Sequence, residues 1–340
     1  MQKLFLLVIN LLIGFNSSAT LATKAFYHRG HCTDQLVFYF DKLPKVTSRS
    51  VAGAKEYVIE LQGLSADVKG ALSQMHSFGD GYHMQIHFKA PSLVIKIEYD
   101  RQKIALVSAS KFVPISQPHA IVIKIERHGK SANKECLRPS SKRTVVLDFG
   151  HGGKDSGTKI GDLAEKDIVR EVGSKLAKML KNDGYNIHLT RTADQYAALD
   201  ERTYLANLKT DAAIFISLHA NYSANPLSEG IETFYLHHGL LDSIDSHHNL
   251  AKLEHLNAQN FKLAQHIHHS LLSSASKSGL VDRKIKRSVS QILLGTEMPA
   301  VLIELGFLSS PKEARLLSSP NYQALLADGI RRGINAWFAA

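Results

Sequence analysis

The sequence has little cysteine, little proline and no long apolar run after its first residues: two cysteines, nine prolines and one tryptophan occur among 340 residues. Two cysteines are too few for a disulfide scaffold or an all-cysteine zinc site. Only 21% of the residues are charged and 44% are hydrophobic, which excludes a disordered or low-complexity protein. No stretch approaches the roughly 20 apolar residues of a membrane span, so no permanent membrane anchor is expected. The length predicts about two domains.

The formal net charge is +10, and the basic excess is concentrated in residues 23–143, whereas residues 144–340 are balanced. A basic first half would attract a polyanion, although a solvated surface explains the same charge. No nucleic-acid recognition motif occurs, and a nucleic-acid partner is not expected.

The N-terminus is typical of an export signal. Lys3 precedes an apolar run over residues 4–13, and small residues follow near Ala19 and Ala22. This pattern predicts a signal peptide over residues 1–22 and a periplasmic or extracellular protein. In an oxidising compartment Cys32 and Cys136 could form a disulfide, but the sequence does not show that the two sulfur atoms meet.

The remaining chain has two parts of different texture. Residues 23–126 contain short alternating runs at 36–40, 57–61, 82–88, 93–99, 103–107 and 120–125, which predict a smaller all-β, sandwich-like domain with a binding or localising role. Residues 127–143 read as a basic linker. From 144 to 340, apolar strands alternate with helical patterns, which predicts an α/β domain with a mostly parallel sheet flanked by helices.

Three residues with metal-binding or acid–base side chains follow strands of this α/β domain. His151 comes just after the strand at 144–148, His219 follows 214–218, and Glu304 ends 300–304. Ligands of such sheets bind at the carboxyl ends of the strands. His151, His219 and Glu165, which begins a predicted helix, could supply the three protein ligands of a catalytic zinc ion, leaving Glu304 as a general base. The spacing alone leaves solvated roles open, and for Glu165 also a helix-capping role.

Several blocks of this half carry a family resemblance. They comprise residues 147–155 with Gly157, and residues 165–166, 190–191, 201–202, 206–207, 217–221, 282–286 and 299–309. In this order they resemble the zinc-dependent N-acetylmuramoyl-L-alanine amidases over residues 144–340. The resemblance implies zinc on His151, Glu165 and His219, a catalytic Glu304, and cleavage of the amide between N-acetylmuramic acid and L-alanine in peptidoglycan during cell-wall remodelling and daughter-cell separation. It also implies a protein activator at the division site, and residues 23–126 are loosely similar to the β-rich localisation module of exported members.

Two alternatives remain. A zinc peptidase that cuts within the stem peptide would use the same side chains, and a non-catalytic wall-binding protein would need none of them. Eight histidines between His237 and His269 are interpreted as solvated. Arg191 and Arg202 could bind substrate carboxylates, although internal salt bridges are their more ordinary role.

Overall fold

The computed structural model describes residues 22–28, 33–50, 55–64, 81–89, 91–112, 119–127, 143–208, 212–237, 242–243 and 250–340. The expected signal sequence up to residue 21, both cysteines and residues 128–142 of the expected linker lie outside these ranges. The chain divides into two compact units, one of Met1–Cys136 with Gly239–Leu250, the other of Leu137–His238 with Ala251–Ala340.

The first unit consists of antiparallel strands in two sheets. One sheet has the order β1-β2-β8-β7-β15 and the other the order β3-β4-β6-β5. Their bounds are β1 Ala22–His28, β2 Thr33–Phe40, β3 Lys45–Ser50, β4 Glu56–Gln62, β5 Tyr82–Lys89, β6 Ser92–Tyr99, β7 Ile104–Phe112, β8 His119–Arg127 and β15 Asp242–Ser243. The all-β expectation for this half is confirmed.

Alternating side chains of these strands form one apolar core. Phe38, Ile59, Ile95 and Ile123 come from four different strands and are fully buried in it. Strand β3 was not expected from the sequence because Lys45–Ser50 is mostly polar and largely exposed. It forms because all six of its residues pair with β4, so pairing compensates for a weak local preference.

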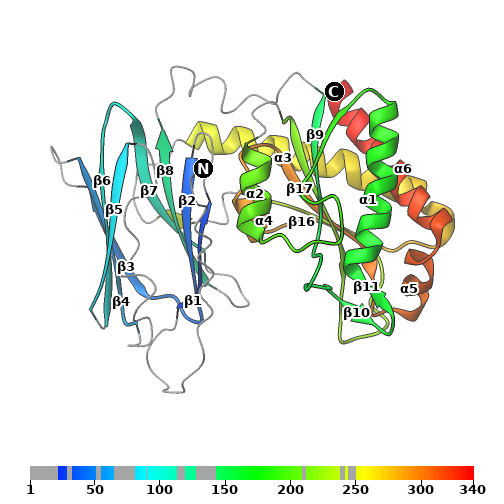
Figure 1. Ribbon diagram of the computed structural model, residues 1–340, viewed down its shortest axis with the longest axis horizontal. Coiled ribbons are helices and arrows are strands. Elements are labelled where there is room, and N and C mark those ends of the chain that lie inside the picture. The colour runs from blue at the N-terminus through cyan, green and yellow to red at the C-terminus, as the bar shows by residue number, and fades with distance from the viewer. Residues whose placement is uncertain are drawn as a thin grey trace. The chain divides into compact units, whose positions relative to one another are not determined.

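The second unit contains a six-stranded, mostly parallel sheet with the order β12-β9-β13-β17-β14-β16 (Figure 1). Its strands are β9 Thr144–Phe149, β12 Asn186–Leu189, β13 Ile214–Asn221, β14 Ile231–Tyr235, β16 Asp282–Arg287 and β17 Ala300–Phe307, and a small hairpin is formed by β10 Lys159–Ile160 and β11 Leu163–Ala164. Only the β14–β17 pair in this sheet is antiparallel. The carboxyl ends of β9, β13 and β17 therefore meet the amino ends of β14 and β16 at one edge.

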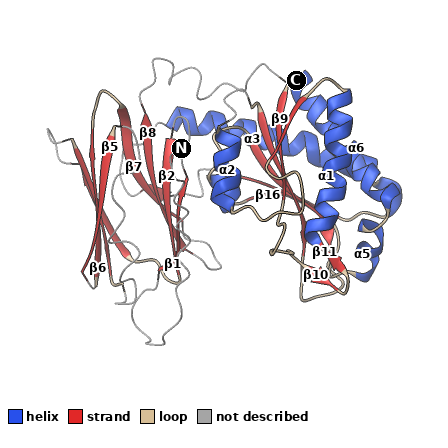
Figure 2. Ribbon diagram, viewed as in Figure 1, coloured by secondary structure: helices blue, strands red, loops and turns tan. Residues whose placement is uncertain are grey.

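Helices cover both faces of this sheet (Figure 2). They are α1 Glu165–Asn182, α2 Leu199–Asn207, α3 Leu250–Ser274, α4 Gln291–Leu294, α5 Pro311–Leu317 and α6 Pro320–Ala339, with a 3-10 turn at Ser276–Ser278. Helices α1, α3 and α6 share one apolar core with the sheet, to which they contribute Val172, Ile267 and Ile330. Helix α2 lies on the opposite face, where its Arg202 bonds Asp148 of β9. No helix in the described ranges is long and apolar enough to cross a membrane.

Side chains alternate between the two faces along each strand. In β13, Ile214, Ile216 and Leu218 enter the apolar core, so Ser217 and His219 face the other way. Directly paired residues of neighbouring strands share a face. His219 pairs with Glu304, and Glu304 pairs with Glu232, so one face carries a row of polar side chains across three strands.

Candidate metal centre

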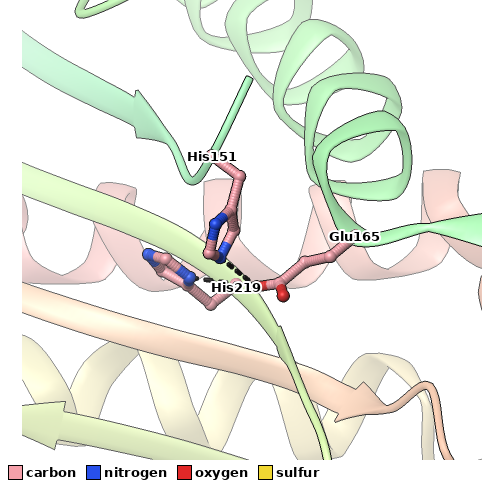
Figure 3. Close-up of side chains that lie close together, drawn as sticks. All are labelled: His151, Glu165 and His219. Atoms are coloured by element: carbon pink, nitrogen blue, oxygen red, sulfur yellow. Dashed lines mark hydrogen bonds and ion pairs between the residues drawn. The ribbon is translucent and has the colours of Figure 1, made fainter. Parts of the chain in front are cut away.

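Three of the predicted site residues converge at the carboxyl edge of the sheet (Figure 3). His151 lies in the loop after β9, Glu165 is the first residue of α1, and His219 lies on β13. Glu165 Oε1 is 3.1 Å from His151 Nε2 and 3.0 Å from His219 Nδ1. One donor atom from each residue lies within 4.8 Å of the other two. The donor set is two imidazole nitrogens and one carboxylate oxygen, which suits zinc with one position left open.

The imidazole of His151 is oriented from its far side. Its Nδ1 lies 2.9 Å from Asp155 Oδ2, so that Nε2 faces Glu165 and His219. A carboxylate behind a ligating histidine fixes the ring and raises its basicity, as is common at metal sites. His151 also has φ 61, a left-handed backbone conformation that few non-glycine residues adopt.

The carboxylate of Glu165 is buried and fixed by backbone donors. Oε1 accepts a hydrogen bond from Ala220 N at 3.0 Å, and Oε2 accepts one from Thr158 N at 2.9 Å. Burial alone would raise the pKa of Glu165, but hydrogen bonds and charge from both histidines hold it well below its usual value. Glu165 is therefore an anion at neutral pH and could neutralise part of a cation's charge.

The same carboxylates act on the imidazoles. Burial lowers the pKa of His151, but Glu165 and Asp155 outweigh burial and raise it to about 9. Burial also lowers the pKa of His219, which Glu165 and Glu304 then raise above its usual value. The centre thus stabilises positive charge at the donor nitrogens, and a cation that replaced those protons would gain the same stabilisation.

Two glycines leave room for this cluster. A Cβ atom on Gly150 would lie 2.4 Å from His219 Cε1, and one on Gly157 would lie 2.5 Å from Glu165 Oε2. Both distances are below any real carbon contact, so the glycine-rich loop lets the backbone approach the donors closely. This explains why glycine occupies these two positions.

The fourth predicted residue, Glu304, lies beside the cluster on the neighbouring strand, in register with His219. Its Oε2 is buried and has no hydrogen-bond partner among the described residues. The pKa of Glu304 is raised to about 7, mainly by burial. The charge of His219 opposes this rise, and the charges of Glu165 and Glu232 add to it. A carboxyl group that titrates near neutrality can both accept and return a proton.

Sequence reasoning missed a buried network that supports His151. Asp148 accepts hydrogen bonds from Arg202 Nη1 at 2.9 Å, Thr190 Oγ1 at 2.5 Å and Ser217 Oγ at 2.7 Å. Arg202 Nη2 donates to the carbonyl oxygen of His151 at 2.6 Å. Asp148 ends an apolar run, so only its position beside a candidate ligand could have suggested this role.

Arg191 braces the same loop. Its guanidinium donates to the carbonyl oxygens of Phe149 at 2.9 Å and Gly150 at 3.2 Å. Arg202 forms the expected internal salt bridge with Asp148, whereas Arg191 donates to the backbone carbonyl oxygens of Phe149, Gly150, Ala193 and Lys166. Both arginines are buried and hold the loop that carries His151.

One of the eight histidines differs from the solvated interpretation. His268 on α3 is only 3% exposed. It lies 2.9 Å from Thr233 Oγ1 through Nδ1 and 2.9 Å from Asp282 Oδ1 through Nε2. It ties α3 to β14 and β16, a contact that helical spacing alone does not reveal.

A parallel α/β sheet whose edge carries a His-Glu-His cluster beside a half-buried glutamate is typical of metal-dependent hydrolases. The chain belongs to the N-acetylmuramoyl-L-alanine amidase family, which matches residues 145–336. It is accordingly an amidase that acts on peptidoglycan, which confirms the enzyme class and the substrate that the resemblance implies.

Several relatives show the same similarity. The germination-specific N-acetylmuramoyl-L-alanine amidase of Bacillus subtilis (strain 168) is 32% identical over 215 residues, 59% of this chain and 81% of that protein. The probable cell wall amidase LytH of Staphylococcus aureus is 28% identical over 216 residues, 61% of this chain and 62% of that protein. The crystal structure of N-acetylmuramoyl-L-alanine amidase from Clostridium difficile 630 has a TM-score of 0.50 and 31% identity, and the match covers 59% of this chain and 99% of that one. Each match covers about three fifths of this chain.

Proposed function

We propose that the protein is an exported zinc amidase that cuts the bond between the lactyl group of N-acetylmuramic acid and the L-alanine nitrogen. The observation that carries this proposal is the convergence of His151, Glu165 and His219, with donor atoms within 4.8 Å of one another, next to the half-buried Glu304.

The donor set fits zinc by its chemistry and by its surroundings. Two imidazoles and one carboxylate are the ligands of many catalytic zinc sites. Asp155 orients one imidazole, and Gly150 and Gly157 keep side-chain atoms out of the cluster. When bound, zinc polarises a carbonyl group and makes a water molecule more acidic.

In this proposal Glu304 moves the proton. Its carboxylate takes a proton from the attacking water, whose oxygen forms a bond to the lactyl carbonyl carbon. The carbon–nitrogen bond then breaks, and the protonated Glu304 gives the same proton to the departing alanine nitrogen. The products are a muramoyl carboxylate and a peptide with a free alanine amine. A pKa of about 7 suits both halves of this exchange.

The remaining parts of the chain fit an exported wall enzyme. The N-terminal pattern over residues 1–22 supports export to the periplasm or the cell exterior. The antiparallel β unit carries the excess basic charge, which supports a localising role on the wall or on a protein partner. Its described residues include no group of His, Cys, Asp and Glu side chains that could hold a metal ion. A protein activator at the division site belongs to the same proposal.

One experiment tests the proposed reaction. The mature protein is incubated with purified sacculi, with and without a chelator, and the new termini are identified. We expect free alanine amines that appear only when zinc is present. Free amines on other stem-peptide residues would instead indicate a zinc peptidase, and bound zinc without any new termini would indicate a wall-binding protein.

A further inference from the structure

The polar face of the sheet continues beyond Glu304 to a second cluster of charges. Glu232 on β14 pairs in register with Glu304, so both side chains lie on the same face. Glu232 is 4% exposed in its side chain and is bound by Arg283 Nε and Lys286 Nζ of β16, each 2.6 Å from Oε1. Asn221 Nδ2 donates to its other oxygen at 3.1 Å.

A bulge in β16 puts both cations on this face. The register between β14 and β16 shifts between the pairs Ile231–Asp282 and Thr233–Ile285. Lys284 is the extra residue and has φ 75. Asp282 and Ile285 both point to the α3 side, where Asp282 contacts His268 and Ile285 packs on the core. In a regular strand two residues three positions apart point to opposite faces, so the bulge is what places Arg283 and Lys286 on the same face of the sheet.

The charges of this cluster do not cancel. One carboxylate faces two cations, which leaves one positive charge in excess. Arg283 uses Nε for Glu232, and its Nη1 and Nη2 make no hydrogen bond to any described residue. Its side chain is 36% exposed and that of Lys286 is 40% exposed. The guanidinium carbon lies 4.8 Å from the centre of the Phe307 ring, which helps to fix the plane of the fork.

We propose that Arg283, supported by Lys286, binds a carboxylate in the peptide part of the substrate while Glu304 acts on the neighbouring amide. A guanidinium with a fixed plane and two free amino groups matches a carboxylate in a bidentate manner, which a lysine cannot do. The ion pair with Glu232 already holds the Arg283 guanidinium in place, so the Arg283 side chain loses little conformational entropy when substrate binds. The inference rests on the proposed function and specifies which stem peptides that site prefers.

The test compares two soluble substrates that differ in one carboxyl group. Both are N-acetylmuramoyl tripeptides of sequence L-Ala–D-Glu–L-Lys, linked through the glutamate γ-carboxyl, with the α-carboxyl either free or converted to an amide. For the wild-type enzyme we expect kcat/KM to be ~10-fold or more higher for the free acid, the range expected for a charge-assisted hydrogen bond. Equal values for the two substrates would overturn the inference. Cleavage of neither at the lactyl–alanine bond would instead contradict the proposed function.

Variants separate recognition from a structural role. Arg283→Gln should raise KM for the free acid ~10-fold or more with little change in kcat, and should change kcat/KM for the amide less than ~3-fold. Arg283→Lys should recover part of the preference. A purely structural role would lower kcat/KM equally for both substrates and would contradict the inference. Because Lys286 still pairs with Glu232 in Arg283→Gln, the buried carboxylate keeps a partner, and melting temperature and zinc content verify the fold.

Arg332→Gln provides the matched control. Arg332 is an exposed arginine on α6 that pairs with Asp328, and its loss changes the net charge by the same amount. It should leave both substrates unaffected. An equal loss of preference in Arg332→Gln would show that overall charge, rather than the fork of Arg283, selects the free acid.

Discussion

The two faces of the six-stranded sheet consist of the same strands but bury different kinds of side chain. Toward α1, α3 and α6, β13 presents Ile214, Ile216 and Leu218, and the surrounding core is almost wholly apolar. Toward the other face, β13 presents Ser217 and His219, which join buried or half-buried Asp148, Glu304 and Glu232 from neighbouring strands. The apolar face contributes most of the hydrophobic stabilisation, and the polar face carries the charged and metal-binding side chains.

This difference follows from energetics. Burying an apolar side chain contributes roughly 25 cal/mol per Å² of apolar surface and needs no particular partner. A buried charge costs free energy unless a counter-charge or hydrogen bond meets it. Asp148 and Glu232 meet that requirement through arginine or lysine, whereas Glu304 Oε2 has no hydrogen-bond partner among the described residues. The carboxyl group whose burial is least compensated stands beside the cluster of metal-type donors.

The sharpest test of the polar face is Glu304→Gln. We expect kcat to fall by about 10²–10⁴-fold, because an amide cannot take the proton, while the zinc content stays near that of the wild type. Turnover is measured by release of alanine amines and zinc by elemental analysis. Glu171→Gln on the exposed surface of α1 is the control. Retained turnover in Glu304→Gln would remove this glutamate from the proposed chemistry.

Asp148→Asn tests the charged network beneath His151, through stability and its pH dependence. Burial would raise the pKa of Asp148, but Arg202 and the hydrogen bonds from Thr190 and Ser217 hold it below its usual value. The carboxylate therefore contributes stability above the unfolded pKa of about 3.9 and loses it as the pH falls through the lower folded pKa.

At neutral pH the substitution should cost about 3–5 kcal/mol, because Arg202 loses its counter-charge. The difference between wild type and variant should shrink as the pH falls below about 4. Urea unfolding at pH 7, 5, 4 and 3 measures it. A difference that stays constant with pH would show that the charge of Asp148 does not stabilise the fold.

Ile216→Ala probes the apolar face of β13, three residues before His219. We expect a loss of about 2–5 kcal/mol in the free energy of unfolding, because a buried side chain is truncated. Zinc affinity should stay within about twofold of the wild type, since Ile216 faces away from the donors. A large loss of zinc affinity in the folded variant would show that the two faces are not independent.

Gly150→Ala tests the close approach of the loop to His219. A Cβ atom there would lie 2.4 Å from Cε1, so the imidazole must shift. We expect about 10–100-fold weaker zinc binding in a competition with a chromophoric chelator, the range seen when support of a metal ligand is disturbed. Gly184→Ala is the control. Gly184 has φ +84, so alanine strains the backbone there, but no atom lies within 4 Å of the new carbon. Its zinc affinity should not change.

The sequence predicts part of this site because the ends of buried strands can be recognised from their apolar runs. The apolar runs before His151, His219 and Glu304 indicate three strands, and parallel strands bring their carboxyl ends to one edge. Cross-strand register and the side-chain contacts of Glu165 depend on packing that no local pattern encodes.

The second charge cluster could not be predicted for a different reason. Strand β16 lacks a clean alternation because Lys284 is an extra residue in it, and Glu232 lies in a run that reads as an ordinary buried strand. The burial of His268 on α3 has no local signal because its partners, Thr233 and Asp282, come from two strands that lie far from it in the sequence. Such residues are found by pairing, not by periodicity.

The left-handed backbone of His151 restricts which residues can replace it. Valine, isoleucine and threonine are disfavoured at φ 61, whereas asparagine and aspartate tolerate it. Among these, only aspartate adds an anionic donor. Aspartate is therefore the replacement that keeps both the backbone conformation and an anionic donor, and a set of one imidazole and two carboxylates would be less selective for zinc over harder cations such as manganese.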